Sequence, residues 1–93
     1  MTIKYSPSFL EIFKKVDVRI RKSFKQRILI FSKNPNDLQL NNHALKKERQ
    51  GYRSIDVNAD YRAVYQEVVM REELVAYFVA LGTHDELYRQ VAE

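Results

Sequence analysis

The sequence contains no cysteine and no tryptophan, and only two glycines and two prolines among 93 residues. The absence of cysteine excludes disulfides and thiolate-ligated metal sites, which is consistent with a reducing cytoplasm. Gly51 and Gly82 are too few for a glycine-rich phosphate loop, so nucleotide-binding motifs of that type are absent. The scarcity of glycine and proline also predicts regular elements joined by short connections.

Long apolar runs are missing as well. Residues 1–5 lack the apolar stretch of a signal peptide. No segment approaches the roughly 20 apolar residues that are needed to span a bilayer. We therefore expect a cytoplasmic protein with no membrane association. The length predicts a single domain over residues 1–93.

Basic side chains are abundant, but only in the first half of the chain. Residues 1–50 carry a net charge of +8 and residues 51–93 a net charge of −4. A basic half favours a polyanionic partner, because lysine and arginine release counterions when they contact phosphates. A solvated, lysine-rich helix face produces the same pattern, and the charge run alone does not decide between the two.

Periodicity and capping signals predict two helices in the first half. Residues 3–5 are typical of a short strand, and the Ser6-Pro7-Ser8 segment then supplies helix-start signals for a helix over residues 8–16. Asp17 is the expected N-cap of a second helix that runs to about Lys33. Residues 35–50 are predicted to form one long irregular loop, and such loops are often functional or mobile.

The second half has the pattern of a sheet. Residues 52–57 and 61–69 alternate with period two and predict two strands joined by a turn. Residues 74–81 are nearly all apolar, as expected of a central strand covered on both faces. Residues 85–91 resemble a short final helix. The expected fold is α+β: a helical hairpin packed on a curved antiparallel sheet, in the order β-α-α-β-β-β with a short C-terminal helix.

Two arginines are predicted to lie on one open face of this sheet. A hairpin that turns at residues 58–60 brings the strands of Arg53 and Arg62 side by side. Two guanidinium groups on one face repel each other unless an anion lies between them, and arginine is suited to bidentate phosphate recognition. The alternative is that the two arginines form ion pairs with Asp56, Asp60 or Glu67.

The sequence has two histidines, His43 in the long loop and His84 directly after the last strand. Such a pair can act as base and acid in metal-free phosphodiester cleavage. One histidine would deprotonate a ribose 2′-hydroxyl and the other would protonate the departing 5′-oxygen, with Arg53 and Arg62 stabilising the added negative charge. Structural or capping roles for both histidines fit the sequence equally well.

Metal chemistry is disfavoured by the same residues. His43 and His84 with Asp56, Asp60 and Asp85 include zinc-ligand types, but no HExxH-like spacing exists and the arginines would oppose a cation. We expect no metal and no cofactor.

Aromatic residues are candidates for stacking on bases. Tyr88 lies four residues after His84, one helical turn away, and would stack on a base beside the cleaved phosphate or anchor the C-terminus on the core. Tyr52, Tyr61 and Tyr65 are expected to be half-buried residues of the sheet.

Three segments together resemble the RelE/ParE toxin superfamily, and within it most of all the RelE and YafQ ribonuclease branch. They are His43-Ala44-Leu45-Lys46 before Gly51-Tyr52-Arg53, then Asp60-Tyr61-Arg62-Ala63-Val64-Tyr65, and finally Leu81-Gly82-Thr83-His84-Asp85-Glu86-Leu87-Tyr88. The resemblance covers nearly the whole chain, and the combination is fairly specific although each segment alone is weak.

The resemblance implies the toxin of a type II toxin–antitoxin system, which cleaves mRNA in the ribosomal A site without metal and is inhibited by a cognate antitoxin. His84, His43 and Asp60 match catalytic positions of the YafQ-like branch. Arg62 matches the arginine of a RelE-like strand, and Arg53 stands where RelE-like members have a strand lysine. These five are the expected catalytic residues, and the expected RNA contacts are Tyr88, Lys46, Lys47, Tyr61 and Asp56.

The sequence departs from this family pattern at two positions. Asp56 stands where YafQ-like members have a strand histidine, and Ile55 replaces a second strand lysine of RelE-like members. The general base is therefore either Asp56 or His43, and catalysis is expected to be weaker. Two alternatives stay open: a gyrase-inhibiting toxin of the ParE branch, which needs no histidine–arginine constellation, and a catalytically weak RNA-binding homologue.

Overall fold

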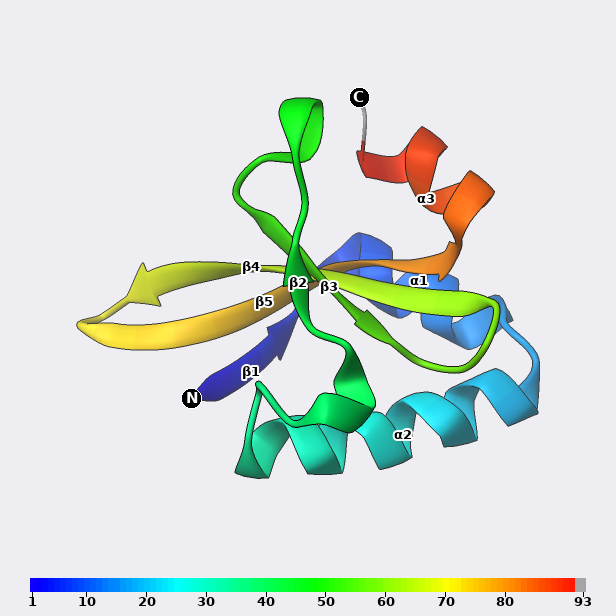
Figure 1. Ribbon diagram of the computed structural model, residues 1–93, viewed down its shortest axis with the longest axis horizontal. Coiled ribbons are helices and arrows are strands. Elements are labelled where there is room, and N and C mark those ends of the chain that lie inside the picture. The colour runs from blue at the N-terminus through cyan, green and yellow to red at the C-terminus, as the bar shows by residue number, and fades with distance from the viewer. Residues whose placement is uncertain (92–93) are drawn as a thin grey trace.

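In the computed structural model, α1 (Pro7–Lys15) and α2 (Val18–Lys33) cover one face of a five-stranded sheet, and α3 (His84–Val91) packs on the other face (Figure 1). The structure describes the backbone of residues 1–91 and the side chains of residues 1–87. The predicted α+β class, with two helices against a sheet and a short C-terminal helix, is confirmed.

The strand order is β1-β5-β4-β3-β2. β3 (Tyr52–Asp56), β4 (Tyr61–Met70) and β5 (Glu73–Thr83) form an antiparallel meander, as predicted. The sheet as a whole is mixed and not only antiparallel, because β1 (Thr2–Tyr5) pairs parallel to β5. β5 carries side chains that are buried on both faces of the sheet. β4 pairs with one edge of β5 and β1 pairs with the other, so the backbone groups on both edges of β5 have partners.

The segment between α2 and β3 is more regular than predicted. Instead of one irregular loop it contains two 3₁₀ turns, η1 (Leu38–Leu40) and η2 (Lys47–Arg49), and a two-residue strand, β2 (His43–Ala44). β2 pairs antiparallel with the free edge of β3. The Leu40 side chain is fully buried, so the segment is tied to the core just before β2 begins. Neither the pairing of β2 with β3 nor the burial of Leu40 can be read from the local periodicity of the sequence.

The helix-start signals act as the sequence predicts. The Ser6 hydroxyl accepts a hydrogen bond of 3.0 Å from the Phe9 amide, and Pro7 occupies the first turn of α1. Asp17 Oδ1 accepts one of 2.7 Å from the Arg19 amide at the start of α2. At the start of α3, the Glu86 carboxylate accepts a hydrogen bond from the Thr83 amide, and the Thr83 hydroxyl accepts one from the Glu86 amide. With this cap the helix begins at His84, one residue earlier than predicted.

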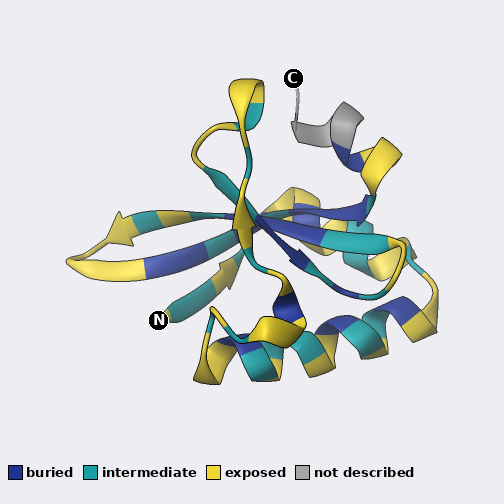
Figure 2. Ribbon diagram, in the orientation of Figure 1, coloured by how far each residue is buried: buried dark blue, intermediate teal, exposed yellow. Residues whose placement is uncertain are grey.

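The main core lies between the sheet and the two N-terminal helices (Figure 2). Phe78 of β5 is fully buried, and its ring centroid lies 5.0–6.0 Å from five other aromatic rings, those of Tyr5, Phe9, Phe24, Phe31 and Tyr65. A smaller cluster of Val64, Ala80 and Leu87 holds α3 on the opposite face. The two clusters hold the sheet between the N-terminal helices on one face and α3 on the other.

Candidate active site

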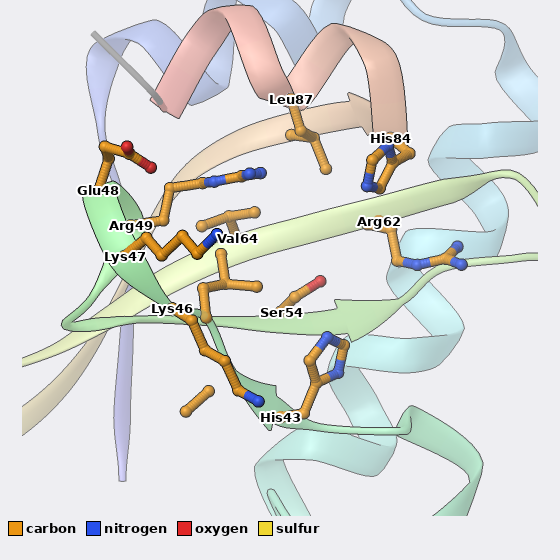
Figure 3. A pocket seen from close by; sticks show the side chains of 12 residues that line it. His43, Lys46, Lys47, Glu48, Arg49, Ser54, Arg62, Val64, His84 and Leu87 are labelled. Atoms are coloured by element: carbon orange, nitrogen blue, oxygen red, sulfur yellow. The ribbon is translucent and has the colours of Figure 1, made fainter.

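A pocket of about 380 Å³ opens on the sheet face that α1 and α2 do not cover (Figure 3). The segment from β2 to η2 forms one side, the start of α3 forms the other, and β3 and β4 form the floor. This volume is in the range of small-ligand sites and is large enough for one nucleotide. The lining residues are His43, Ala44, Leu45, Lys46, Lys47, Glu48, Arg49, Ser54, Arg62, Val64, His84 and Leu87.

Five of the residues predicted from sequence meet in this pocket. His43 comes from β2, Arg62 from β4 and His84 from the first position of α3, while Lys46 and Lys47 come from the segment after β2. Figure 3 shows the two histidine rings on opposite sides of the pocket, with Ser54 and Arg62 between them. Positions 41 residues apart in the chain are therefore brought to one site.

Arg53 is not part of this site, and the prediction that it shares a face with Arg62 is wrong. Arg62 lies opposite Asp56 in the register of β3 and β4, so Arg53, three residues before Asp56, points to the other face. There it lies opposite Tyr65 and donates from Nε to the Asn42 side chain at 2.9 Å. Sequence alternation is correct for each strand, but it does not fix the register between them.

Other predicted residues also lie away from the pocket or are not described. Tyr61 is half-buried and packs against the core on the helix side, away from the pocket. Asp60 is exposed in the turn between β3 and β4 and does not line the pocket. The side chain of Tyr88 lies outside the described residues.

The His43 ring has a defined hydrogen-bonding state. Its Nδ1 lies 2.9 Å from the carbonyl oxygen of Asn41. A carbonyl only accepts, so Nδ1 must carry a proton in this contact. In neutral His43 the lone pair is then on Nε2, which is the atom available as a base.

His84 has a different environment. Its side chain is 74% exposed, and its Nδ1 lies 3.8 Å from a carboxylate oxygen of the neighbouring Asp85. It is the first residue of α3, where the Thr83–Glu86 capping box fixes the backbone. Asp85 and Glu86 in the first turn offset the positive end of the helix dipole.

Arg62 is held by an ion pair at the edge of the pocket. Its Nε lies 3.1 Å from Asp56 Oδ1, and both side chains are mostly buried. Asn41 donates to the other carboxylate oxygen of Asp56 at 3.4 Å. The sequence alternative in which an arginine pairs with Asp56 is thus correct for Arg62. Asp56 is occupied by this pair and does not itself line the pocket.

The electrostatic character of the pocket is strongly positive. Four basic side chains line it against one acidic side chain, Glu48. Arg49 and Ser54 are among the lining residues that the sequence analysis missed. Arg49 belongs to the Lys46–Arg49 charge run, which signals it, and Ser54 is buried at the pocket floor, where only the strand register places it.

Among the described residues, no group of three or more histidine, cysteine, aspartate or glutamate side chains is arranged to hold a metal ion. No helix in the described part of the chain is long and apolar enough to cross a membrane.

The fold is similar to that of several solved toxins. The YoeB/ParE toxin from Agrobacterium tumefaciens superposes with a TM-score of 0.73 at 18% identity, covering 90% of this chain and 99% of that chain. The RelBE2 toxin–antitoxin complex from Mycobacterium tuberculosis gives 0.70 at 18% identity, covering 89% and 96%. YafQ from E. coli strain BL21(DE3) gives 0.64 at 24% identity, covering 92% and 96%.

Sequence comparison leads to the same group. No curated protein matches the chain. A family model does match, over residues 3–88, and it describes the ParE toxin of the type II toxin–antitoxin system parDE. The match includes β2 to β5, all of β1 except Thr2, and the residues that line the pocket. The chain therefore belongs to the ParE toxin family of type II toxin–antitoxin systems, within the RelE/ParE superfamily.

Proposed function

We propose that this toxin is a ribosome-dependent endoribonuclease that cleaves mRNA in the ribosomal A site without a metal ion. The observation that carries the proposal is the pocket itself: two histidines on opposite sides of a basic, nucleotide-sized pocket, with an arginine between them. This arrangement fits transfer of a proton at each end of a phosphodiester group.

His43 is the proposed general base. The Asn41 carbonyl fixes the proton on Nδ1, so Nε2 accepts the proton of the ribose 2′-hydroxyl. The 2′-oxygen then attacks the adjacent phosphorus atom in line with the departing 5′-oxygen. Asp56, the other candidate base, is engaged by Arg62 and is better suited to orienting that arginine.

His84 is the proposed general acid. Its exposed ring lies across the pocket from His43 and, when protonated, donates a proton to the departing 5′-oxygen. The products are a 2′,3′-cyclic phosphate and a 5′-hydroxyl end. Arg62 stabilises the additional negative charge that develops on the phosphate during the attack.

The remaining cations of the pocket serve binding. Lys46 and Lys47 are placed to hold neighbouring phosphates, and Tyr88 is retained as a proposed stacking partner for a base. The charge of residues 1–50 supports docking on ribosomal RNA, and such a toxin works in the cytoplasm.

An antitoxin is the proposed protein partner. The solved structures of RelBE2 and of DinJ–YafQ are toxin–antitoxin complexes, and both resemble this chain in fold. An acidic, partly disordered antitoxin segment would complement the basic helices.

Cleavage on programmed ribosomes tests the nuclease directly. The wild-type toxin should cut the mRNA, and His43→Ala or His84→Ala should lower the single-turnover rate by about 10²–10⁴-fold while mRNA binding stays intact. Glu11→Gln serves as the control, because Glu11 is exposed on α1 outside the pocket, and it should cut normally. A His43→Ala/His84→Ala protein that cuts at the wild-type rate would contradict the mechanism.

Gyrase inhibition is the second candidate function, and the family match to ParE favours it. Purified gyrase in a supercoiling assay separates the two candidates. Inhibition of supercoiling without any cut in ribosome-bound mRNA would establish this candidate and overturn the nuclease. Tight mRNA binding with neither effect would instead indicate a homologue that has lost activity.

A further inference from the structure

The position of His43 depends on a short and exposed strand. β2 has only two residues, both exposed, and pairs with β3 alone at the edge of the sheet. The partner of the His43 ring, the carbonyl of Asn41, belongs to a residue in the left-handed region with φ 48°. Two paired residues give little rigidity, so the strand needs another anchor if a base is to be held at one place.

Asn42 supplies that anchor from the opposite side of the sheet. Its Nδ2 donates to the Pro35 carbonyl at 2.8 Å and to the Tyr65 hydroxyl at 2.7 Å. Its Oδ1 accepts from Arg53 Nε at 2.9 Å. Each partner fixes the orientation of the amide, because a carbonyl must accept and a guanidinium must donate.

The partners of Asn42 are themselves rigid. The Tyr65 ring is buried and contacts Phe31 edge-on, with centroids 5.1 Å apart, and Phe78 at 5.0 Å. Arg53 lies on β3, which is paired with β2 on one side and β4 on the other, and Pro35 follows the end of α2. Asn42, the residue before the proposed base, is thus hydrogen-bonded to the aromatic core, to the sheet and to the residue that follows the end of α2.

We infer that the Asn42–Arg53–Tyr65 network positions the general base. It holds the backbone of residues 41–43 so that the Asn41 carbonyl meets His43 Nδ1 and leaves Nε2 facing the pocket. Arg53 and Asn42 are positioning residues that act from the other face of the sheet, without touching RNA. This inference rests on the proposed function for its catalytic consequence, but its structural consequence is independent of RNA.

The ring protonation of His43 in the free toxin is the first measurement. Two-bond ¹H–¹⁵N spectra of the imidazole rings report which nitrogen carries the proton, at a pH where His43 is neutral. The wild-type protein should have Nδ1–H. Asn42→Ala should convert His43 to a mixture of the two tautomers, whereas Asn36→Ala should not, because Asn36 is an exposed asparagine of the same segment. An unchanged Nδ1–H tautomer in folded Asn42→Ala would overturn the inference.

The single-turnover rate of mRNA cleavage on programmed ribosomes is the second measurement. Asn42→Ala should lower the rate by about 10–100-fold with an unchanged Kd for mRNA, since small displacements of a catalytic group have effects of that size. Arg53→Lys keeps a donor for Asn42 Oδ1 and should retain more activity than Arg53→Met. Equal rates for Arg53→Met and the wild type would contradict the positioning role.

Tyr65→Phe is a second variant that still tests the inference if Asn42→Ala does not fold. It keeps the ring packing and removes only one of the three hydrogen bonds of Asn42, so it should give a smaller tautomer change and a smaller rate loss. Failure of the two proposals is distinguishable. A tautomer change in Asn42→Ala together with no cleavage by the wild type would refute the nuclease and support the positioning network.

Discussion

Among the residues that the structure describes, the buried hydroxyls of Tyr5 and Tyr65 couple the stability of this protein to alkaline pH. Burial raises the pKa of Tyr5 above the ordinary value of 10.0. Burial also raises the pKa of Tyr65, although the hydrogen bond from Asn42 and the charge of Arg53 act in the opposite direction. The protonated form is therefore favoured in the folded state, and the folded state retains protons that the unfolded chain releases.

The sign of the effect follows from this difference. The stabilisation is fully present below the unfolded pKa of about 10 and is lost as the pH rises through the raised folded pKa. We expect the free energy of unfolding to fall above pH 10, and to fall less steeply in Tyr5→Phe and Tyr65→Phe. Urea unfolding at a series of pH values from neutral to alkaline measures this free energy for the wild type and the two variants. An equally steep fall in the double variant would exclude the tyrosines as its cause.

At the scale of elements, the β4–β5 hairpin is closed by a turn that its sequence does not favour. Arg71 and Glu72 both have positive φ, 49° and 65°, between the paired residues Met70 and Glu73. This is the geometry of a type I′ turn, which matches the twist of the strands and favours asparagine and glycine. A side chain in the left-handed region costs roughly 1 kcal/mol.

Replacing this turn should stabilise the protein. Arg71→Asn together with Glu72→Gly removes the side-chain strain and should raise the free energy of unfolding by about 1 kcal/mol, less the added entropy of glycine in the unfolded chain. Chemical denaturation measures the change. The turn is remote from the residues that line the pocket, so RNA cleavage should be unaffected. A loss of stability would mean that Arg71 or Glu72 makes a contact more important than the strain.

At the scale of the whole molecule, the proposed function requires that the lysines of the pocket, and not those elsewhere, bind RNA. Lys46 and Lys47 line the pocket, whereas Lys33 lies at the exposed end of α2, outside it. Each phosphate contact to a single strand adds about 0.7 to the slope of log K against log salt concentration. The salt dependence of binding therefore counts the lysines that contact RNA.

We expect Lys46→Ala and Lys47→Ala each to reduce the magnitude of that slope by about 0.7, and Lys33→Ala to leave it unchanged. The measurement is the Kd of a short single-stranded RNA at several salt concentrations. If Lys33→Ala alone changed the slope, RNA would bind along the helix face, and the pocket lysines would have no part in binding.

Much of the local structure is predictable because it depends on neighbours in the chain. Ser6 and Asp17 cap their helices through hydrogen bonds to residues two or three positions away. The strands of the meander also have local patterns, which are alternation in residues 52–57 and 61–69 and an apolar run in residues 74–81. The charge asymmetry and the histidine pair are equally plain in the sequence. Together with the resemblance to the toxin superfamily, they led to five residues that line the pocket.

Tertiary structure decided which of those residues act together. Arg53 and Arg62 are separated by the register of β3 on β4, which depends on pairing across a turn. His43 reaches the pocket only because β2 adds to a free strand edge, and Asn42 holds it there through partners at positions 35, 53 and 65. The sequence alone determined the helices, the strands of the meander, the charge and the reactive side chains, since these are local properties. Long-range pairing and packing determined which face each side chain occupies.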